Sequence, residues 1–194
     1  MKLRGLYAIT PEQPDLAKVR LALQGGAKLL QYRSKSPDRA QASAVVRLAR
    51  EFKVPVIIND DVELALELGA DGAHLGRDDG DLRAARRKLE GRILGASCYG
   101  EISLARAAAR AGVDYIAFGS VFPSPTKPNA ARAPLSLFSE AKPLGVPLAA
   151  IGGVTLERAP QLVGAGVDLL AVITDLFDAP DVRARAAEYG KLFA

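Results

Sequence analysis

Short apolar runs alternate along this chain with segments of helical periodicity. The run from Val54 to Ile58 is continuous and rich in β-branched residues, which is typical of a strand buried on both faces of a parallel sheet. A short helix is predicted next, with Asp61 as its N-cap and Gly69 as the left-handed residue at its end. Residues 73–75 then form another strand. Right-handed crossover places the ends of both strands at the same edge of the sheet.

A repeated glycine pattern extends this arrangement to the whole sequence. Gly26, Gly69, Gly112 and Gly166 each precede an apolar run, and their spacings of 43, 43 and 54 residues each leave room for two strand-helix units. The strands are predicted at about residues 3–9, 27–33, 54–59, 72–75, 92–97, 113–118, 147–151 and 168–173. This pattern predicts one α/β domain over residues 1–194, a compact (β/α)8 TIM barrel.

A doubly wound open sheet is the competing fold. Such a sheet normally carries a glycine-rich dinucleotide motif after its first strand, whereas this chain has Ala8-Ile9-Thr10-Pro11 there. Among the connecting helices, one is predicted to begin with Ser36 as N-cap and Pro37 as its first residue. Its inward face would be Ala40, Ala44, Val45 and Leu48.

Composition and charge argue against several classes of function. The net charge is +4, but many arginines fall on predicted helices without a recognition motif, so we expect a solvated surface and no nucleic-acid partner. The sequence has no apolar run long enough to cross a membrane and no signal peptide, which predicts a cytoplasmic protein. The single cysteine, Cys98, excludes an internal disulfide and a cysteine-rich zinc site. Any bound metal is therefore expected to have mainly oxygen ligands.

Polar residues gather at the carboxyl ends of the predicted strands, where barrel enzymes carry their active sites. Gln31, Arg33 and Lys35 alternate along an extended segment and so share one face, an arrangement suited to a polyanion. A salt-bridge cluster at the barrel edge is the structural alternative. Asp60 and Asp79 are the predicted magnesium ligands, because Mg²⁺ commonly takes one or two carboxylates plus waters and phosphate oxygens.

The last two strand ends and one long loop complete the predicted site. Gly152-Gly153 and Ile173-Thr174 occupy the standard phosphate position of TIM barrels, although a tight turn alone also explains the glycines. The loop between Gly119 and Pro134 holds four prolines and is expected to present Ser124, Thr126 and Lys127. Two separate anion sites across one barrel mouth indicate a transferase.

Four other residues receive structural interpretations. Asp61 and Asp78 are explained as a helix cap and a turn residue rather than as metal ligands. His74, the only histidine, lacks partners for a catalytic triad and is expected to pack or hydrogen-bond at a strand end. Cys98 is expected to be an unactivated residue at the barrel mouth.

With these motifs in view, the chain resembles the thiamine-phosphate synthase family along its whole length. The matching segments are residues 6–10 (LYAIT), 31–35 (QYRSK), 58–60 (IND), 70–76 (ADGAHLG), 114–115 (DY), 123–127 (PSPTK) and 150–153 (AIGG). The resemblance implies that 4-amino-2-methyl-5-hydroxymethylpyrimidine diphosphate is joined to 4-methyl-5-(2-phosphoethyl)thiazole, giving thiamine phosphate and pyrophosphate.

The resemblance also implies roles for individual residues. The implied pyrimidine diphosphate site is Gln31, Tyr32, Arg33, Ser34, Lys35, Asn59, Ser97 and Lys127. The implied thiazole phosphate site is Ser124, Pro125, Thr126, Gly153, Ile173 and Thr174, and Asp60 and Asp79 would hold Mg²⁺. Arg33, Lys35, Lys127 and Ser97 would act in catalysis by stabilising the departing pyrophosphate. The attacking thiazole nitrogen carries no proton, so no general base is required and a dissociative, carbocation-like step is expected.

Some positions depart from the family pattern, and two other functions compete. Cys98-Tyr99 stands where many relatives have a histidine, Ser124 replaces a common threonine, and Arg77 replaces a common glutamine. The related thiazole tautomerase is one alternative, but it does not need the diphosphate and magnesium residues. A non-catalytic phosphate-binding barrel is the other. It would bind the same ligands without turnover.

Overall fold

The computed structural model describes residues 3–123 and 132–194, and within them parallel strands close into a barrel in the order β1 to β8. The strands are β1 (Gly5–Ile9), β2 (Leu29–Tyr32), β3 (Val56–Asn59), β4 (Gly72–Leu75), β5 (Ile93–Tyr99), β6 (Tyr115–Phe118), β7 (Leu148–Ile151) and β8 (Leu169–Val172). Every boundary lies within two residues of its predicted position. β8 pairs with β1, so the predicted (β/α)8 barrel is confirmed and the open sheet is excluded.

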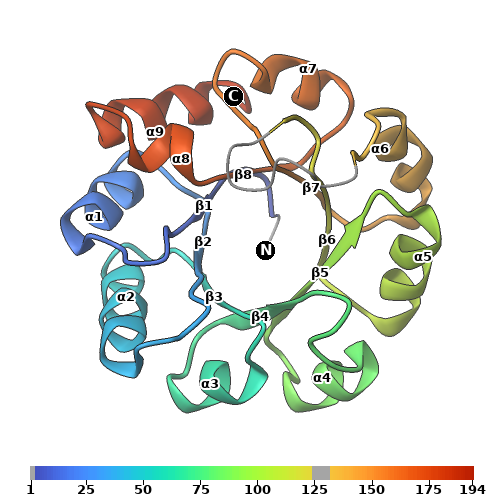
Figure 1. Cartoon of the computed structure of the whole chain (residues 1–194), viewed down its shortest axis with the longest axis horizontal. Helices are drawn as coiled ribbons and strands as arrows, with labels where there is room; N and C mark the ends of the chain where they lie inside the picture. Colours follow the sequence, from blue (N-terminus) through green and yellow to red (C-terminus); the bar gives the residue numbers. More distant parts are fainter. Residues whose placement is uncertain (1–2, 124–131) are drawn as a thin grey trace.

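Helices form a ring outside the strands, as Figure 1 shows in a view down the barrel. They are α1 (Leu16–Gln24), α2 (Arg39–Glu51), α3 (Val62–Glu67), α4 (Leu82–Lys88), α5 (Ile102–Ala111), α6 (Ser136–Ala141), the 3₁₀ turn η1 (Lys142–Leu144), α7 (Ala159–Gly164), α8 (Thr174–Phe177) and α9 (Val182–Lys191). In the described part of the chain, no helix combines the length and the apolar character that crossing a membrane requires.

Aspartate caps begin many of these helices. The capping residues, each accepting a hydrogen bond from a backbone N–H in the first turn, are Asp15, Asp38, Asp61, Asp81 and Asp181. Such a cap stabilises a helix by about 1 kcal/mol. The predicted cap role of Asp61 is confirmed, with its carboxylate 2.8 Å from the backbone nitrogen of Leu64.

The predicted start of the second helix is wrong. α2 begins at Arg39, and its N-cap is Asp38 rather than Ser36, because the Asp38 carboxylate accepts from Gln41 N at 3.0 Å. The inward face shifts accordingly. Val45 and Leu48 are buried as expected, whereas Ala40 is exposed and Ala44 is only half-buried. The other buried residues of α2 are Ala42, Val46 and Ala49.

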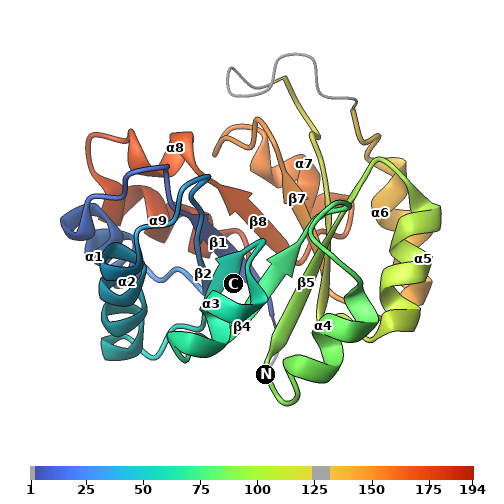
Figure 2. The ribbon, with the colours of Figure 1, turned by 60° about the horizontal axis from the view of Figure 1, so that its bottom comes forward.

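Strand side chains divide between two cores. Along β1, Leu6 and Ala8 face the helices, while Tyr7 and Ile9 face the barrel interior. This alternation follows from the two-residue period of a strand. The interior is therefore a packed core and not a channel. In Figure 2 the barrel is turned on its side, with the short helix α8 at the upper rim and the N-terminus at the lower end.

One glycine makes room for the largest interior side chains. Gly95 on β5 is paired with His74 on β4 and with Tyr115 on β6. The rings of His74 and Tyr115 stack beside it, with centroids 5.4 Å apart and planes inclined by 24°. A Cβ at position 95 would lie 2.1 Å from Cζ of Tyr115. Because Tyr115 is fully buried, its ring has no free space into which it can move.

We predict that Gly95→Ala destabilises the barrel by about 1–3 kcal/mol or more, since overpacking forces buried side chains off their rotamers. The matched control is Gly190→Ala in α9, where an added Cβ meets nothing within 4 Å. That change should stabilise the protein by about 0.5–1 kcal/mol through helix propensity. Urea denaturation of both variants measures the two effects. Equal stability of Gly95→Ala and the parent protein would contradict the packing argument.

Candidate active site

The two predicted metal ligands come from neighbouring strand ends. Asp60 directly follows β3, and its left-handed backbone (φ 63°) turns the chain sharply before α3. Aspartate tolerates this conformation better than most residues. The Asp60 backbone N–H donates to the carbonyl of His74 at 2.8 Å, which joins the exits of β3 and β4. The carboxylate is thereby placed at the rim rather than on the flank of the barrel.

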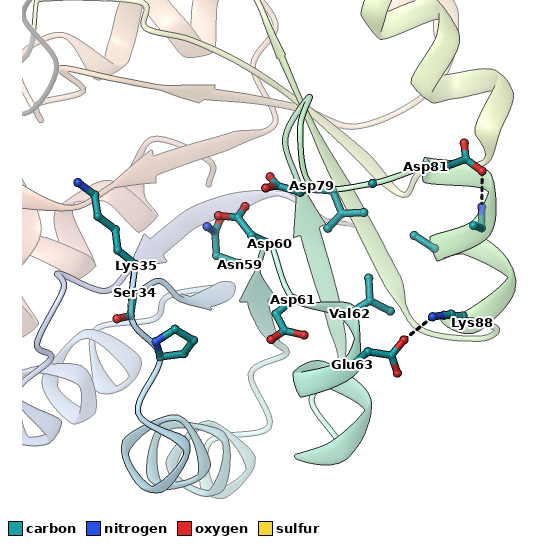
Figure 3. Close-up of a pocket in the computed structure, with 15 residues that line it drawn as sticks. Ser34, Lys35, Asn59, Asp60, Asp61, Val62, Glu63, Asp79, Asp81 and Lys88 are labelled. Atoms are coloured by element: carbon teal, nitrogen blue, oxygen red, sulfur yellow. Dashed lines mark hydrogen bonds and ion pairs between the residues drawn. The ribbon is translucent and has the colours of Figure 1, made fainter.

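Asp79 reaches the same opening from the loop after β4. Its Oδ2 accepts from Gly76 N at 2.7 Å, so the loop itself orients the carboxylate. Figure 3 shows Asp60 and Asp79 pointing into one opening, with Asn59 beside them and Lys35 across it. This opening has a volume of about 520 Å³, and Lys35, Asn59, Asp60 and Asp79 all line it. Ser34 lines it as well, so the structure brings together five of the residues singled out from the sequence.

The segment after β2 supplies the cationic side of the mouth. Gln31 is buried at 2% exposure inside the barrel, Arg33 is half-buried, and Lys35 is exposed. Two residues outside this segment hold its backbone. Thr10 Oγ1 accepts from Arg33 N at 3.0 Å, and a carboxylate oxygen of Glu12 accepts from Lys35 N at 2.6 Å.

Glu12 also fixes Ser34. The Ser34 hydroxyl donates to the same oxygen of Glu12 at 2.8 Å. This hydrogen bond, together with that from the Lys35 backbone, lowers the pKa of Glu12 below its ordinary value. The sequence pattern did not single out Glu12, because it lies in the loop after β1 and its partners, Ser34 and Lys35, are distant in sequence. The signal that could have found it is its place three residues after β1, the strand that pairs with β2.

Tyr32 has a different position from its neighbours. Its side chain is buried on the outer side of the barrel, at 1% exposure, among residues that pack against the helices. The hydroxyl lies 3.2 Å from Oε1 of Gln41 and 3.4 Å from the backbone oxygen of Asp38. The side chain therefore holds the start of α2, and its contact with substrate stays a prediction.

The glycine turn after β7 and the start of α8 lie next to one another. β7 and β8 are paired with Ile151 beside Ala171, so Gly152-Gly153 and Ile173-Thr174 leave the barrel on adjacent strands. Both glycines have positive φ, 96° and 63°. A Cβ on Gly153 would lie 2.5 Å from the backbone oxygen of Pro123, so this turn requires glycine for space as well as for conformation. The other predicted residues of this site, Ser124, Pro125 and Thr126, lie outside the described residues, as does Lys127 of the predicted pyrimidine diphosphate site.

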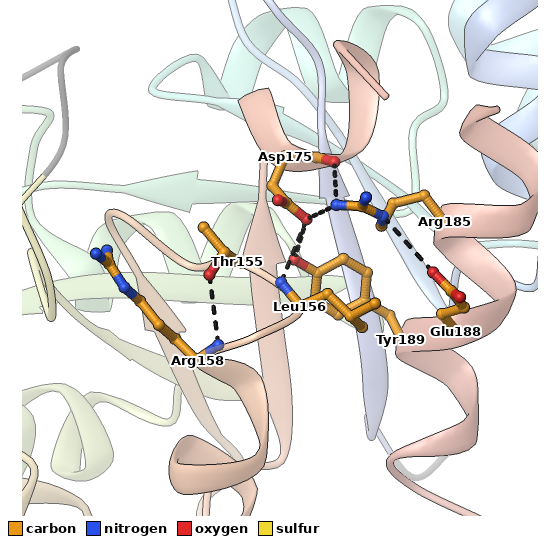
Figure 4. A network of polar contacts seen from close by, with 7 residues as sticks. All are labelled: Thr155, Leu156, Arg158, Asp175, Arg185, Glu188 and Tyr189. Atoms are coloured by element: carbon orange, nitrogen blue, oxygen red, sulfur yellow. Dashed lines mark hydrogen bonds and ion pairs between the residues drawn. The ribbon is translucent and has the colours of Figure 1, made fainter. Parts of the chain in front are cut away.

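A half-buried carboxylate, that of Asp175, ties these two loops together, as Figure 4 shows. Asp175 Oδ2 accepts from the backbone of Leu156 at 3.3 Å, from the Tyr189 hydroxyl at 2.7 Å and from Arg185 Nη1 at 2.7 Å. Burial and the Asp175 hydrogen bond raise the pKa of Tyr189 above its ordinary value. One side chain thus joins the loop after β7, α8 and α9. Sequence reasoning missed Asp175, although it directly follows the predicted phosphate-site residues Ile173 and Thr174.

A chain of hydrogen bonds crosses the barrel interior beneath the mouth. Gln31 Nε2 donates to the Tyr7 hydroxyl at 2.5 Å, and the Tyr7 and Tyr115 hydroxyls are 2.7 Å apart. His74 Nδ1 lies 2.8 Å from the Tyr115 hydroxyl, and His74 Nε2 lies 2.8 Å from Oγ of Ser97. We call this set of five residues the interior relay. Its last member, Ser97, is half-buried at the mouth.

The titratable groups below the mouth are neutral near pH 7. Burial lowers the pKa of His74 to about 4, partly offset by the negative charge of Asp79. Burial raises the pKa values of Tyr7 and Tyr115 well above their ordinary value of 10. Burial also raises the pKa of Cys98 to about 12. The expectations that His74 packs and hydrogen-bonds at a strand end and that Cys98 is not activated are both confirmed.

Comparison with known proteins decides the family. The sequence model of the family described as thiamine monophosphate synthase matches residues 6–176. This chain belongs to the thiamine-phosphate synthase family. A thiamine-phosphate synthase of Aromatoleum aromaticum is 58% identical over 202 residues, covering 99% of this chain and 97% of the relative. Another, from Thiobacillus denitrificans, is 54% identical over 98% of this chain and 95% of its own length.

Solved structures agree with the family assignment. The thiamine phosphate pyrophosphorylase of Pyrococcus furiosus has a TM-score of 0.89 and 33% identity, covering 99% of this chain and 96% of that chain. A 3-hexulose-6-phosphate synthase has a TM-score of 0.75 over 98% of this chain and 100% of that one. Its identity of 16% means that it shares only the fold. The resemblance inferred from the motifs is confirmed.

Two of the residues that depart from the family pattern contact one another at the rim. The Arg77 guanidinium lies over the Tyr99 ring at 5.0 Å from its centroid, and Arg77 N donates to the Tyr99 hydroxyl at 3.3 Å. Arg77 also forms an ion pair with Glu101. These contacts join the loops after β4 and β5. Arg77 and Tyr99, which both differ from the family pattern, therefore pack against each other. The hydrogen bond from Gly76 N that orients the Asp79 carboxylate is present beside them.

We predict that the free energy of unfolding falls as the pH is lowered from about 6.5 towards 4. In that range the unfolded chain protonates His74, whose ordinary pKa is 6.5, while the folded protein keeps it neutral down to about 4. The unfolded state therefore binds more protons, and stability is lost by up to about 3 kcal/mol.

The matched control is His74→Gln, which removes the titrating ring and keeps a polar side chain at the same strand position. Urea unfolding of both proteins at several pH values separates the effect of His74 from that of the carboxylates. The parent protein should lose more stability than the variant between pH 7 and pH 4.5. Parallel pH profiles would show that His74 does not cause the loss.

Proposed function

We infer that this chain is a thiamine-phosphate synthase. It joins 4-amino-2-methyl-5-hydroxymethylpyrimidine diphosphate to 4-methyl-5-(2-phosphoethyl)thiazole and releases pyrophosphate. The observation that carries this conclusion is full-length membership of the family, with 58% identity to a named synthase. The mouth supports it, since Lys35, Asn59, Asp60 and Asp79 line one opening. The substrates are small phosphorylated molecules.

The pyrimidine diphosphate is proposed to bind over the ends of β2 to β5. Arg33 and Lys35 would neutralise the phosphate oxygens of this substrate. Asn59 would bind the substrate at the rim, and Ser97 would donate a hydrogen bond to its diphosphate. Gln31 would contact the pyrimidine from inside the barrel, where it is 2% exposed. The Ser34 hydroxyl donates a hydrogen bond to Glu12, so Ser34 would position this segment rather than bind the substrate through its side chain. Lys127 completes the proposed set.

The thiazole phosphate is proposed to bind on the opposite side of the mouth. Gly153 and the backbone at Ile173 and Thr174 lie at adjacent strand ends, as the paired register of β7 and β8 requires. Ser124, Pro125 and Thr126 are proposed to close this site. Two anions seated on opposite sides of the same rim would bring the thiazole nitrogen and the pyrimidine methylene together.

The residues at the mouth fit a magnesium ion. Asp60 and Asp79 offer carboxylate oxygens to one opening, and Asp79 is already oriented by Gly76. Among the described residues, no group of three or more histidine, cysteine, aspartate or glutamate side chains gathers in a way that could hold a metal. A two-carboxylate site completed by phosphate oxygens and waters is the environment that Mg²⁺ prefers. When bound, the ion would neutralise charge on the departing pyrophosphate.

Bond breaking is proposed to precede bond formation. The pyrimidine amino group can donate electrons into the ring as the C–O bond to the diphosphate breaks, which gives a carbocation-like species. Arg33, Lys35, Lys127 and Ser97 would stabilise the leaving pyrophosphate as its charge grows. The thiazole nitrogen then attacks without losing a proton, so no general base is required.

We also propose that residues 1–194 act as one cytoplasmic barrel domain without a nucleic-acid partner. The strands between Gly5 and Val172 close a single barrel, and α9 packs against α1 and β1. Several surface arginines are paired with acidic residues, as in Arg86 with Asp114 at 2.8 Å. Cys98 is a free, buried thiol, in keeping with a reducing compartment.

We predict that pyrophosphate is released only when both substrates and Mg²⁺ are present, with thiamine phosphate formed in equal amount. A coupled phosphate assay together with chromatography of the product measures both. Metal-free conversion of the thiazole alone would instead identify a tautomerase. Binding of both substrates without any turnover would identify a non-catalytic barrel.

Two variants make this assay specific for the proposed metal site. Asp79→Asn should raise the Mg²⁺ concentration needed for half-maximal rate by at least about tenfold, since even groups that only orient metal ligands contribute 10–100-fold to affinity. The control is Asp78→Asn, because Asp78 is an exposed turn residue beside it. Equal metal dependence of the two variants would rule out Asp79 as a ligand.

We predict that electron-withdrawing substituents on the pyrimidine slow the bond-breaking step. A carbocation-like species is destabilised by such groups, whereas a direct displacement is much less affected. Single-turnover measurements with a series of substituted pyrimidine diphosphates test this expectation, with their binding constants measured separately. A rate that does not depend on the substituent would exclude the dissociative step.

A further inference from the structure

The interior relay has an unusual property, because the Tyr7 and Tyr115 hydroxyls each lie between two hydrogen-bond partners and the His74 ring has one partner at each of its two nitrogens. A hydroxyl has one hydrogen, and a neutral imidazole has one N–H. Fixing the direction of any one bond therefore fixes the direction of the others. Within the described residues, no fully buried side-chain nitrogen or oxygen lacks a hydrogen-bond partner, and Tyr7 and Tyr115 each have two partners in the relay. Where one partner donates to such a hydroxyl, the hydroxyl's own hydrogen is left for the other partner.

The direction follows from Gln31. Its Nε2 faces the Tyr7 hydroxyl, and an amide nitrogen can only donate. The Tyr7 hydrogen must then point to the Tyr115 oxygen, 2.7 Å away, and the Tyr115 hydrogen to His74 Nδ1, 2.8 Å away. Nδ1 of His74 must be the unprotonated nitrogen. Nε2 consequently carries the hydrogen and donates to Ser97 Oγ at 2.8 Å.

The direction of these hydrogen bonds determines whether Ser97 and Gln31, the two ends of the relay, present a donor or an acceptor to a ligand. Ser97 Oγ receives a hydrogen from His74, so its own hydrogen is directed elsewhere and is available for an anion. At the other end, Gln31 uses its amide nitrogen on Tyr7 and keeps its carbonyl oxygen as an acceptor. If the relay ran the other way, Ser97 would donate to His74 and would turn a lone pair towards the diphosphate, which repels it.

We propose that the interior relay holds His74 as its Nε2–H tautomer and thereby fixes Ser97 as a hydrogen-bond donor to the diphosphate. His74, Tyr115 and Tyr7 are positioning residues, because they act on the substrate only through Ser97 and Gln31. The neutral state of His74 agrees with this role, since burial lowers its pKa to about 4. An imidazolium would donate from both nitrogens and would break the bond from Tyr115. This inference rests on the proposed diphosphate site.

The tautomer can be observed directly, because His74 is the only histidine in the sequence. Labelling the protein with nitrogen-15 histidine gives one imidazole, whose two nitrogen shifts and long-range proton couplings show which nitrogen carries the hydrogen. At neutral pH we expect the Nε2–H form. The Nδ1–H form, or an even mixture, would overturn the proposal.

Removing one hydroxyl tests whether the relay imposes this tautomer. Tyr115→Phe keeps the ring that packs beside Gly95 and removes the donor to His74 Nδ1. We expect Nδ1–H to appear in the nitrogen-15 spectrum of this variant. Tyr7→Phe, one step further from His74, should shift the tautomer ratio in the same direction. An unchanged tautomer in both variants would show that His74 is not set by the relay.

A double-mutant cycle tests whether the relay affects anion binding. The measured quantity is the affinity for inorganic pyrophosphate in the presence of Mg²⁺. Loss of the Ser97 hydroxyl in Ser97→Ala should weaken pyrophosphate binding by about 10-fold or more, as for other hydrogen bonds to charged groups. Tyr115→Phe should weaken it less, and the double variant should bind as Ser97→Ala does. Additive losses would show that Tyr115 acts independently of Ser97.

The same experiments separate this proposal from the proposed function. If pyrophosphate did not bind to the parent protein, the diphosphate site would be wrong, whatever tautomer His74 adopts. If pyrophosphate bound tightly and His74 were in the Nδ1–H form, the synthase function would stand and the relay would be rejected.

Discussion

The packing of Tyr115 against His74 across Gly95 is the contact on which the mouth depends. A barrel of this size has no empty space inside, so its interior residues must fill it and pair every polar atom. Here two tyrosines and a histidine fill the upper part of the barrel, and glycine at position 95 leaves the room they need. The polar atoms of these three side chains hydrogen-bond to one another, so the rings fill the interior without leaving these polar atoms unpaired. This layer forms a packed base under the proposed substrate sites.

The rim above this base divides into two halves, and each half is held by a carboxylate outside the proposed contacts with substrate. Glu12 fixes the cationic segment after β2 through Ser34 and Lys35. Asp175 joins the loop after β7 to α8 and α9. Loops that bind substrate have few apolar contacts of their own, so their geometry depends on such bonds. The separation of the two supports allows either half to be positioned without disturbing the other.

The architecture was predictable because its signals are local and repeated. Glycines that precede apolar runs recur at spacings of 43, 43 and 54 residues, and strand boundaries such as those of β4 follow from them directly. Helix starts were harder, since Ser36, Pro37 and Asp38 are all good starting residues, and only the bond from Gln41 N to Asp38 decides among them. Asp60 and Asp79 were found because parallel strands put their ends on one rim. Glu12, Asp175 and the relay could not be found in this way, because their partners are distant in sequence and depend on barrel closure.

The protonation states below the mouth bear on the kind of catalysis that this barrel supports. His74 stays neutral until the pH approaches 4, and Tyr7 and Tyr115 hold their protons because burial raises their pKa values. None of these three side chains can exchange a proton with substrate near neutral pH. Their dipoles, however, have one fixed direction, and fixed dipoles stabilise developing charge without reorganising. The proposed reaction, which needs no proton transfer but builds charge on a leaving pyrophosphate, matches an interior in which His74 is neutral near pH 7.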